Sequence, residues 1–161
     1  MNRPNLKLHR IFISAGHRFV GRHGLAPAEH PIREVEEVEC VAHRGLRGDR
    51  YFDGPADSKG QVTLFAAEVF DRLRIELALP AADPSALRRN LFVSGAELNA
   101  LIGVEFDLQG VVMAGVEECR PCYWMDSAIG PGAEVWLRGR GGLRCRILTS
   151  GWLHTQVEAP C

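Results

Sequence analysis

The alternation of apolar and polar residues in the second half of this chain restricts the fold. In residues 104–108 every second residue is apolar, and after a turn-prone Gln-Gly pair residues 111–116 return as a partner strand. Residues 143–147 repeat the pattern, with leucine, cysteine and isoleucine on one face and two arginines on the other. The pattern predicts short antiparallel strands that each bury one face.

One segment has the 3.6-residue period of a long helix. Its apolar residues recur at offsets of three and four and are Ala66, Val69, Phe70, Leu73 and Leu77. Pro80 and Pro84 follow and end it. Further strands are expected at residues 35–41 and 61–65. Many short strands, 17 glycines and one helix predict a mainly β fold, a small β-barrel with the helix packed on it, rather than a doubly wound sheet.

Length and composition are those of one globular domain. The chain has 161 residues, of which 46% are hydrophobic and 24% charged, and this is enough for a single core. We expect residues 1–34 to form a loop-rich segment, with some strand, that leads into the same domain as residues 35–161. Three histidines of this segment, His17, His23 and His30, are spaced too irregularly to share a helix face, so we interpret them as solvated.

The charge balance excludes several classes of partner. The chain has 19 basic and 20 acidic residues and a net charge of −1 at pH 7, which gives no field that could hold a nucleic-acid backbone or an anionic membrane. Residues 11–16 form the longest early apolar stretch, which is too short for a signal peptide or a spanning helix. We therefore expect a cytoplasmic protein that binds neither nucleic acid nor membrane.

Five cysteines are an odd number for a protein expected in the cytoplasm, where thiols are reduced, catalytic or metal-bound. Cys119 and Cys122 form a C-x-x-C pair, which is typical of a redox dithiol, half of a zinc site, or ligands for a soft metal. The other three cysteines, Cys40, Cys145 and Cys161, are single and distant, so a four-ligand zinc site is disfavoured. We interpret Cys40 and Cys145 as core residues.

The position of the C-x-x-C pair also argues against a thioredoxin-like dithiol. Such a pair follows an early strand and precedes several βα elements, whereas only about 40 mostly strand-like residues follow Cys122. The remaining hypothesis is a thiolate exposed at a strand-to-helix corner. Arg120, helix-end amides or a bound metal would activate it.

Arginine supplies 17 of the 19 basic residues, and the two lysines are Lys7 and Lys59. Guanidinium groups bind phosphate oxygens in a bidentate manner, so the arginines at residues 88–89 and 138–146 could form an anion site as well as plain surface charge. The chain has no P-loop, no dinucleotide-binding glycine pattern after a strand and no Gly-x-Ser-x-Gly motif. ATP, NAD and serine-hydrolase chemistry are therefore not indicated.

Six segments occur in the order found in one known family. They are residues 45–50 (GLRGDR), 59–64 (KGQVTL), 88–91 (RRNL), 95–103 with its LNALIG end, 117–122 (EECRPC) and 140–144 (RGGLR). Each is weak by itself, but the order of all six is specific. On these segments the chain resembles the MOSC family, the molybdenum-cofactor sulfurase C-terminal domain, in its stand-alone bacterial form, with residues 35–161 as the domain.

The resemblance implies a β-barrel that binds the molybdenum cofactor, a pterin that carries a dithiolene and a phosphate. In relatives such as hydroxylaminopurine-resistance proteins and the amidoxime-reducing component, a cysteine ligates molybdenum and N-hydroxylated compounds are reduced. That cysteine matches Cys122, which the resemblance makes the metal ligand and catalytic residue, with Cys119 as a second thiol. A soft thiolate suits such a metal. The family's polar positions near the cofactor, which we assign to the pterin and its phosphate, match Arg50, Arg89, Asn90 and Arg144.

The family association leaves other functions open. Because the domain is fused to a pyridoxal-phosphate sulfurase in some relatives, Cys122 could instead carry a persulfide, with Cys119 as relay and a cysteine desulfurase as partner. Pyridoxal-phosphate catalysis by this chain itself is not expected, because it needs a Schiff-base lysine and only Lys7 and Lys59 exist. A storage module that binds the cofactor without turnover is the third alternative.

The leading hypothesis is an oxidoreductase that takes electrons from a separate donor protein, because no flavin, haem or iron–sulfur motif is present. Substrate, donor and oligomeric state stay open, a homodimer included. One segment departs from the family pattern. After Ser150, residues 151–157 stand where a closing strand with a Gly-Asp turn is expected, so barrel closure or cofactor retention could differ.

Overall fold

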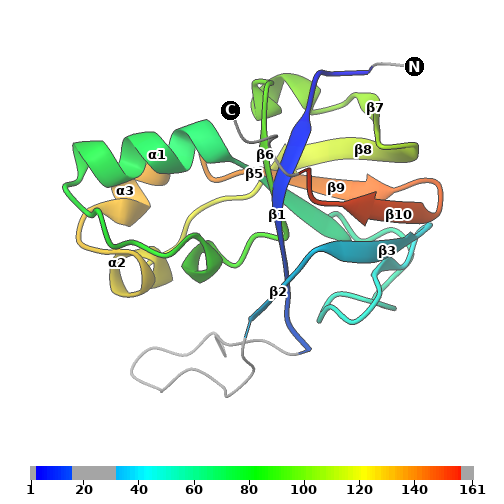
Figure 1. Cartoon of the computed structure of the whole chain (residues 1–161), viewed down its shortest axis with the longest axis horizontal. Helices are drawn as coiled ribbons and strands as arrows, with labels where there is room; N and C mark the ends of the chain where they lie inside the picture. Colours follow the sequence, from blue (N-terminus) through cyan, green and yellow to red (C-terminus); the bar gives the residue numbers. More distant parts are fainter. Residues whose placement is uncertain (1–2, 16–31, 157–161) are drawn as a thin grey trace.

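The computed structural model describes residues 3–15 and 32–156, and β-strands predominate in them (Figure 1). Seven strands form one curled sheet in the order β2-β1-β6-β5-β9-β8-β7. Their bounds are Lys7–Ile13 for β1, Arg33–Val35 for β2, Val62–Ala66 for β5, Leu91–Ser94 for β6, Glu105–Leu108 for β7, Val111–Glu118 for β8 and Leu143–Ile147 for β9. Neighbours are antiparallel, except that β5 and β6 run parallel.

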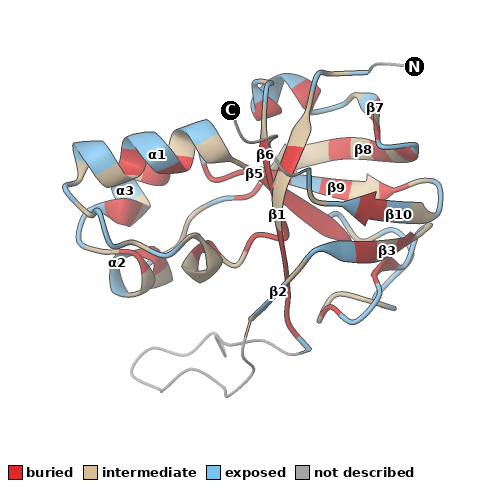
Figure 2. Cartoon of the chain, in the orientation of Figure 1, coloured by how far each residue is buried: buried red, intermediate tan, exposed pale blue. Residues whose placement is uncertain are grey.

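A second sheet of three strands, in the order β10-β3-β4, faces the curled sheet. Its strands are β3 (Glu37–Val41), β4 (Gly45–Leu46) and β10 (Gly151–His154). Inward side chains of both sheets, such as Cys40 and Phe106, belong to one continuous apolar core (Figure 2). The two sheets therefore enclose a barrel-like interior, which confirms the predicted mainly β fold.

Helices cover the other face of the curled sheet and gather at one side of the molecule (Figure 1). They are α1 (Ala67–Glu76), α2 (Trp124–Ala128) and α3 (Ala133–Leu137), together with the 3-10 turn η1 (Pro84–Leu87). A second 3-10 turn, η2 (Leu98–Leu101), instead packs its leucines against the core between the two sheets. Phe92 on β6 stands at the centre of a second core. Its ring centroid lies 5.4 Å from that of Phe12, 5.3 Å from that of Phe65 and 6.0 Å from that of Phe70 on α1. Such aromatic pairs stabilise the contact by about 0.5 to 1.5 kcal/mol each beyond area burial.

The long helix was predicted with the correct buried face. Phe70 and Leu73 are buried in α1, which is the one helix of ten residues in the described part of the chain. It ends at Glu76, before the prolines, and Ala78 then adopts a left-handed conformation with φ of 54°. The hairpin of β7 and β8 is also confirmed, with positive φ at both residues of its Gln-Gly turn.

The strand expected at residues 35–41 is confirmed as β3 over Glu37–Val41, but Val35 belongs to a separate strand, β2. The chain bends at Glu36, so β2 joins the large sheet and β3 joins the small one. The bend is needed because one straight strand cannot lie in both sheets. The segment after Ser150 forms β10, which pairs with β3 and completes the small sheet.

The first 34 residues contribute β1, which lies between β2 and β6 in the large sheet. His17, His23, His30 and Cys161 lie outside the described residues. Within the described ranges, none of the helices combines the length and apolar character that a membrane crossing requires.

Candidate functional site

Cys119 and Cys122 lie where the sequence predicts them, at the corner between strand β8 and helix α2. The Cys119 N–H donates to the Gly142 carbonyl at 2.8 Å, and the Cys122 carbonyl accepts from the Met125 N–H at 2.9 Å. The Cys119 residue is only 5% exposed, whereas Cys122 is half-buried. Both thiols are free. The corner therefore holds a sheltered thiol and a more accessible one, three residues apart.

A pocket of about 450 Å³ opens at this corner. Five of the six predicted site residues line it, namely Cys119, Cys122, Arg50, Arg89 and Arg144. They come from the β4–β5 loop, the end of η1, the β8–α2 corner and strand β9, so distant segments of the chain converge here. The structure thus brings the two thiols and the guanidinium groups of Arg50 and Arg89 to one cavity.

Arg89 is anchored by backbone carbonyls rather than by a carboxylate. Its Nε donates to the Gly141 carbonyl at 2.8 Å, Nη1 to Leu87 at 2.9 Å and Nη2 to Cys119 at 3.2 Å. The residue is 7% exposed. Because carbonyl dipoles solvate the charge without cancelling it, Arg89 fixes the Cys119 backbone and adds a positive potential to the pocket.

Arg50 carries a buried polar atom for which the described residues offer no acceptor. Its side chain is 6% exposed, its Nη2 donates to the Arg88 carbonyl at 3.0 Å, and its Nη1 lies 3.4 Å from the Asp49 carboxylate. The guanidinium also lies over the Tyr51 ring, 4.7 Å from its centroid. Among the described residues no acceptor reaches its buried Nε. A donor of this kind at the wall of a pocket is suited to an incoming acceptor.

Arg88 also lines the pocket, although the family resemblance does not assign it to the cofactor. It adopts the left-handed conformation, with φ of 58° and ψ of 33°, which is uncommon for a residue other than glycine and is often found at functional sites. Burial lowers the pKa of its guanidinium, and the positive charge of nearby Arg50 lowers it further. Its identity as the first arginine of the Arg-Arg-Asn segment was the available signal.

Arg144 stands on the exposed side of β9, next to Cys119 and Glu117. Burial lowers the pKa of its guanidinium, but the Cys119 sulfur and the Glu117 carboxylate raise it more, and the net direction is upward. The Glu117 carboxylate lies 3.7 Å from Arg144 and 3.6 Å from the ammonium of Lys59. Lys59 and Arg120 also line the pocket, so its mouth is basic as well as its wall.

Asn90 is the predicted site residue that the structure places elsewhere. Its side chain is buried in the core, where Oδ1 accepts from the backbone N–H and the hydroxyl of Thr63, both at 3.1 Å. Its Nδ2 donates to the Phe12 carbonyl at 3.0 Å. Asn90 therefore ties β6 to β5 and β1 and does not line the pocket, although it supports the position of Arg89 next to it.

The two cysteines assigned to the core are buried there. Burial raises the pKa of Cys40 to about 12, and it raises the pKa of Cys145 as well. Such thiols stay protonated at neutral pH and are poor nucleophiles. Within residues 3–15 and 32–156, no three His, Cys, Asp or Glu side chains gather as a metal site.

Gly141 and Gly142 allow the backbone around the cysteine corner to pack closely. A Cβ on Gly141 would overlap the Cys119 carbonyl oxygen, and one on Gly142 would overlap the Leu64 carbonyl oxygen. Gly142 also has a φ of 108°, which side chains rarely adopt. The glycine pair in the RGGLR segment is thus explained by the close approach that lets Arg89 reach both Cys119 and Gly141.

The arrangement agrees with a comparison at the family level. The family model of the MOSC domain matches residues 43–158, most of the chain. The chain belongs to the MOSC domain family. The matched range contains every residue placed in the pocket above. No curated protein matches the sequence.

Solved structures share the fold of this MOSC domain. The YuaD protein from Bacillus subtilis is similar with a TM-score of 0.71 and 16% identity, over 96% of this chain and 94% of that one. YiiM from Escherichia coli is similar with a TM-score of 0.57 and 15% identity over 90% of this chain. A protein described as hypothetical is similar with a TM-score of 0.58 and 16% identity over 91% of this chain. This chain spans 65% of the length of each of the latter two.

Proposed function

We propose that this MOSC domain holds a molybdenum cofactor in the cysteine pocket and reduces N-hydroxylated compounds, with Cys122 as the metal ligand. The observation that carries the proposal is that Cys122 and the arginines Arg50 and Arg89 line one pocket. A separate protein would donate the electrons, because the sequence has no flavin, haem or iron–sulfur motif. The reduced thiols also suit a cytoplasmic protein.

The pocket fits such a group in volume, charge and donor type. Its volume of about 450 Å³ lies in the range of small-molecule and cofactor sites, roughly 300 to 1,000 Å³. The buried Nε of Arg50 offers a hydrogen bond that no described residue accepts. Guanidinium groups match the geometry of a phosphate, and a thiolate suits a soft metal. Arg50, Arg88 and Arg89 would hold the phosphate end, and Cys122 the metal.

When bound, the cofactor would supply two electrons, and with two protons these would convert an N–OH group into N–H and a water molecule. The protein residues prepare the site for it. Arg89 donates to the Cys119 carbonyl and, through the Leu87 and Gly141 carbonyls, ties this corner to the neighbouring segments, which holds the corner that carries Cys122. Both thiols line the pocket, and Cys122 is better placed for ligation because it is the more exposed of the two.

Metal analysis tests the ligand assignment. The protein is produced in a host that makes the cofactor, purified without oxygen, and its molybdenum and pterin are measured. We expect stoichiometric molybdenum in the wild type, a loss to background in Cys122→Ser, and retention in the matched variant Cys119→Ser. A Cys122→Ser protein that keeps stoichiometric molybdenum contradicts the ligand assignment, and a wild type without either component contradicts the binding.

A second candidate is a sulfur carrier that holds a persulfide on Cys122. The observation that favours it is that two free thiols line the same pocket, with Arg144 beside the sulfur of Cys119. After incubation with a cysteine desulfurase and cysteine, mass spectrometry would find one added sulfur atom on Cys122. Its absence from both cysteines counts against this function and leaves the molybdenum proposal intact.

A further inference from the structure

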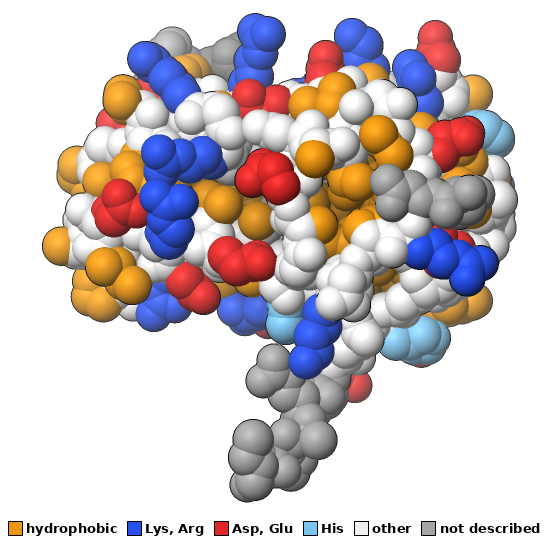
Figure 3. Space-filling model, turned by 90° about the horizontal axis from the view of Figure 1, so that it is seen from above, with side chains coloured by type: hydrophobic (Ala, Val, Ile, Leu, Met, Phe, Trp, Pro, Cys, Tyr) orange, Lys and Arg blue, Asp and Glu red, His pale blue; other side chains and the backbone are white. Residues whose placement is uncertain are grey.

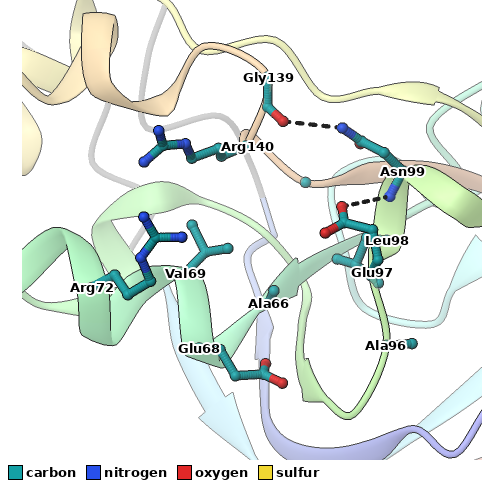
Figure 4. A pocket seen from close by; sticks show the side chains of 11 residues that line it. Ala66, Glu68, Val69, Arg72, Ala96, Glu97, Leu98, Asn99, Gly139 and Arg140 are labelled. Atoms are coloured by element: carbon teal, nitrogen blue, oxygen red, sulfur yellow. Dashed lines mark hydrogen bonds between the residues drawn. The ribbon is translucent and has the colours of Figure 1, made fainter.

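A second cavity lies beside the first turns of α1, apart from the cysteine pocket. Its volume is about 410 Å³, and its walls are α1, the turn that leads into η2, and the loop between α3 and β9 (Figure 4). None of the residues assigned to the cysteine pocket lines it. The face seen from above in Figure 3 carries basic and acidic side chains close together, and not one large patch of a single sign. Within the cavity itself, the two arginines lie together on one side.

One side of the cavity is cationic. The guanidinium of Arg140 stacks on the Trp136 ring, 4.3 Å from its centroid, and that of Arg72 lies 5.9 Å from the same centroid. Arg72 also pairs with Glu76 at 3.2 Å. For Arg140 no carboxylate lies within ion-pair distance in the described part of the chain. Two cations held at one indole repel each other, and an anion between them removes that cost.

Two carboxylates also line the cavity, Glu97 on the side opposite the arginines and Glu68 on α1, one turn before Arg72. Glu97 caps η2, with its Oε1 3.4 Å from the Asn99 N–H, and Glu68 accepts from the Gly95 N–H at 3.0 Å. Asn99 in turn donates to the Gly139 carbonyl at 3.0 Å, which links this side to the loop that bears Arg140. Figure 4 shows the two arginines on one side of the cavity and Glu97 with Asn99 on the opposite side. Each carboxylate thus has a backbone contact that fixes it and oxygen capacity left over.

We propose that this cavity binds a small zwitterion with a carboxylate and an ammonium group, as free amino acids and short peptides have. The carboxylate lies between Arg140 and Arg72, and the ammonium group faces Glu97. Two arginines and two glutamates give the wall no net charge, but Glu97 lies across the cavity from both arginines. A plain anion would meet the repulsion of Glu68 and Glu97, and a plain cation that of the arginines, so a ligand with both charges is the best complement.

The volume supports a ligand of this size. About 410 Å³ lies within the usual range of small-ligand sites, roughly 300 to 1,000 Å³. Val69 and Leu98 add apolar surface to the wall, which suits the aliphatic part of an amino acid. The inference does not depend on molybdenum binding, because the two cavities are lined by different side chains.

Calorimetric titration of the full chain with defined probes tests the proposal. The probes are glycine, γ-aminobutyrate and glycylglycine as zwitterions, and acetate and methylammonium as single charges, all at equal ionic strength. We expect saturable binding of at least one zwitterion, with a Kd at least about tenfold below that of either single-charge probe. Failure of all three zwitterions to saturate overturns the proposal, and so does acetate that binds as tightly as they do.

Substitutions locate the binding. Arg140→Gln and Glu97→Gln should each weaken the zwitterion at least about tenfold, and Glu97→Gln keeps an oxygen that can cap η2. Arg138→Gln is the matched control, because Arg138 is exposed, lies in the same loop and does not line the cavity. Binding that is equally strong in wild type and Arg140→Gln overturns the site, as does a control that weakens as much as Arg140→Gln.

Discussion

Single arginines of the cysteine pocket differ in what their charge does for the protein. Arg89 donates to three carbonyls and so holds together η1, the β8–α2 corner and the glycine loop. Arg50 makes weaker contacts and keeps a buried donor without an acceptor in the described residues. We therefore expect Arg89 to matter for folding and Arg50 to matter mainly for a ligand.

Arg89→Met tests the structural role. The substitution leaves three carbonyls near the pocket without their donor, and it should lower the free energy of unfolding by about 3 kcal/mol. Urea denaturation at neutral pH measures this change. The control Arg138→Met removes an exposed arginine and should stay within about 0.5 kcal/mol of wild type. A loss below about 1 kcal/mol in Arg89→Met would show that solvent replaces the guanidinium at low cost.

The raised pKa of Cys40 predicts that the protein loses stability at alkaline pH. Its pKa rises from an ordinary 9.0 to about 12 in the folded protein, so the thiol stays protonated there while the unfolded chain ionises. The stabilisation is complete below pH 9 and is lost as the pH rises through about 12, with a slope of at most about 1.4 kcal/mol per pH unit. Urea denaturation between pH 8 and pH 11 should therefore give a flatter decline for Cys40→Ala than for wild type. Parallel declines would contradict the assignment.

Asn90, which lies outside the cysteine pocket, directly follows Arg89, which lines the pocket. Residues 88–90 read Arg-Arg-Asn, and the resemblance assigned the second and third to the cofactor. In the structure Arg88 and Arg89 line the pocket and Asn90 turns into the core. Arg88 adopts a left-handed conformation at the end of η1, just before this pair and β6. A local backbone angle of this kind is set by tertiary packing, and side-chain alternation cannot reveal it.

At the level of elements, strands with clean alternation were predictable and β1 was not. Leu143–Ile147 alternates buried and exposed residues and was assigned correctly. In Lys7–Ile13 the register shifts between Leu8 and Arg10, so Leu8, Ile11, Phe12 and Ile13 are all buried. The register shift breaks the two-residue alternation of buried and exposed side chains. Near the end of the strand the alternation is lost altogether, because side chains on both faces are buried in a core. The helix could be predicted because its apolar residues recur at offsets of three and four over the whole segment.

The contact between the β8–α2 corner and the glycine loop makes a sharp prediction. Gly141→Ala places a Cβ against the Cys119 carbonyl, so the loop must move away from the corner and strain the Arg89 contacts. We expect a loss of about 2 kcal/mol in the free energy of unfolding, together with reduced molybdenum content. The control is Gly54→Ala, where the nearest atom to a new Cβ is the Tyr51 carbonyl oxygen at 3.5 Å. Equal stability of the two variants would contradict the close approach.

For the whole molecule, the positions of the charges are a better guide to anion binding than the net charge. The net charge is −1, yet the cysteine pocket is lined by Arg50, Arg88, Arg89 and further basic residues. Composition alone excluded long-range attraction of polyanions, and that argument does not extend to one small anion held in a partly buried site. The local field there is strong because burial reduces screening. The convergence of distant segments that creates it could be expected only through the family resemblance.

Anion binding should therefore stabilise the protein even without a pterin. Pyrophosphate can neutralise the repulsion among the pocket arginines, and at about ten times its Kd it would add roughly 1.4 kcal/mol, or about 3 to 6 °C in the midpoint of thermal unfolding. Sodium chloride at equal ionic strength should give a smaller rise, because screening is weak at buried charges. Arg50→Gln should lose most of the pyrophosphate increment, whereas the exposed Arg138→Gln should keep it. If sodium chloride gives the same increment, or if the increment survives in Arg50→Gln, the anion acts elsewhere on the surface. The cysteine pocket would then not be the site that holds the phosphate end of the proposed cofactor.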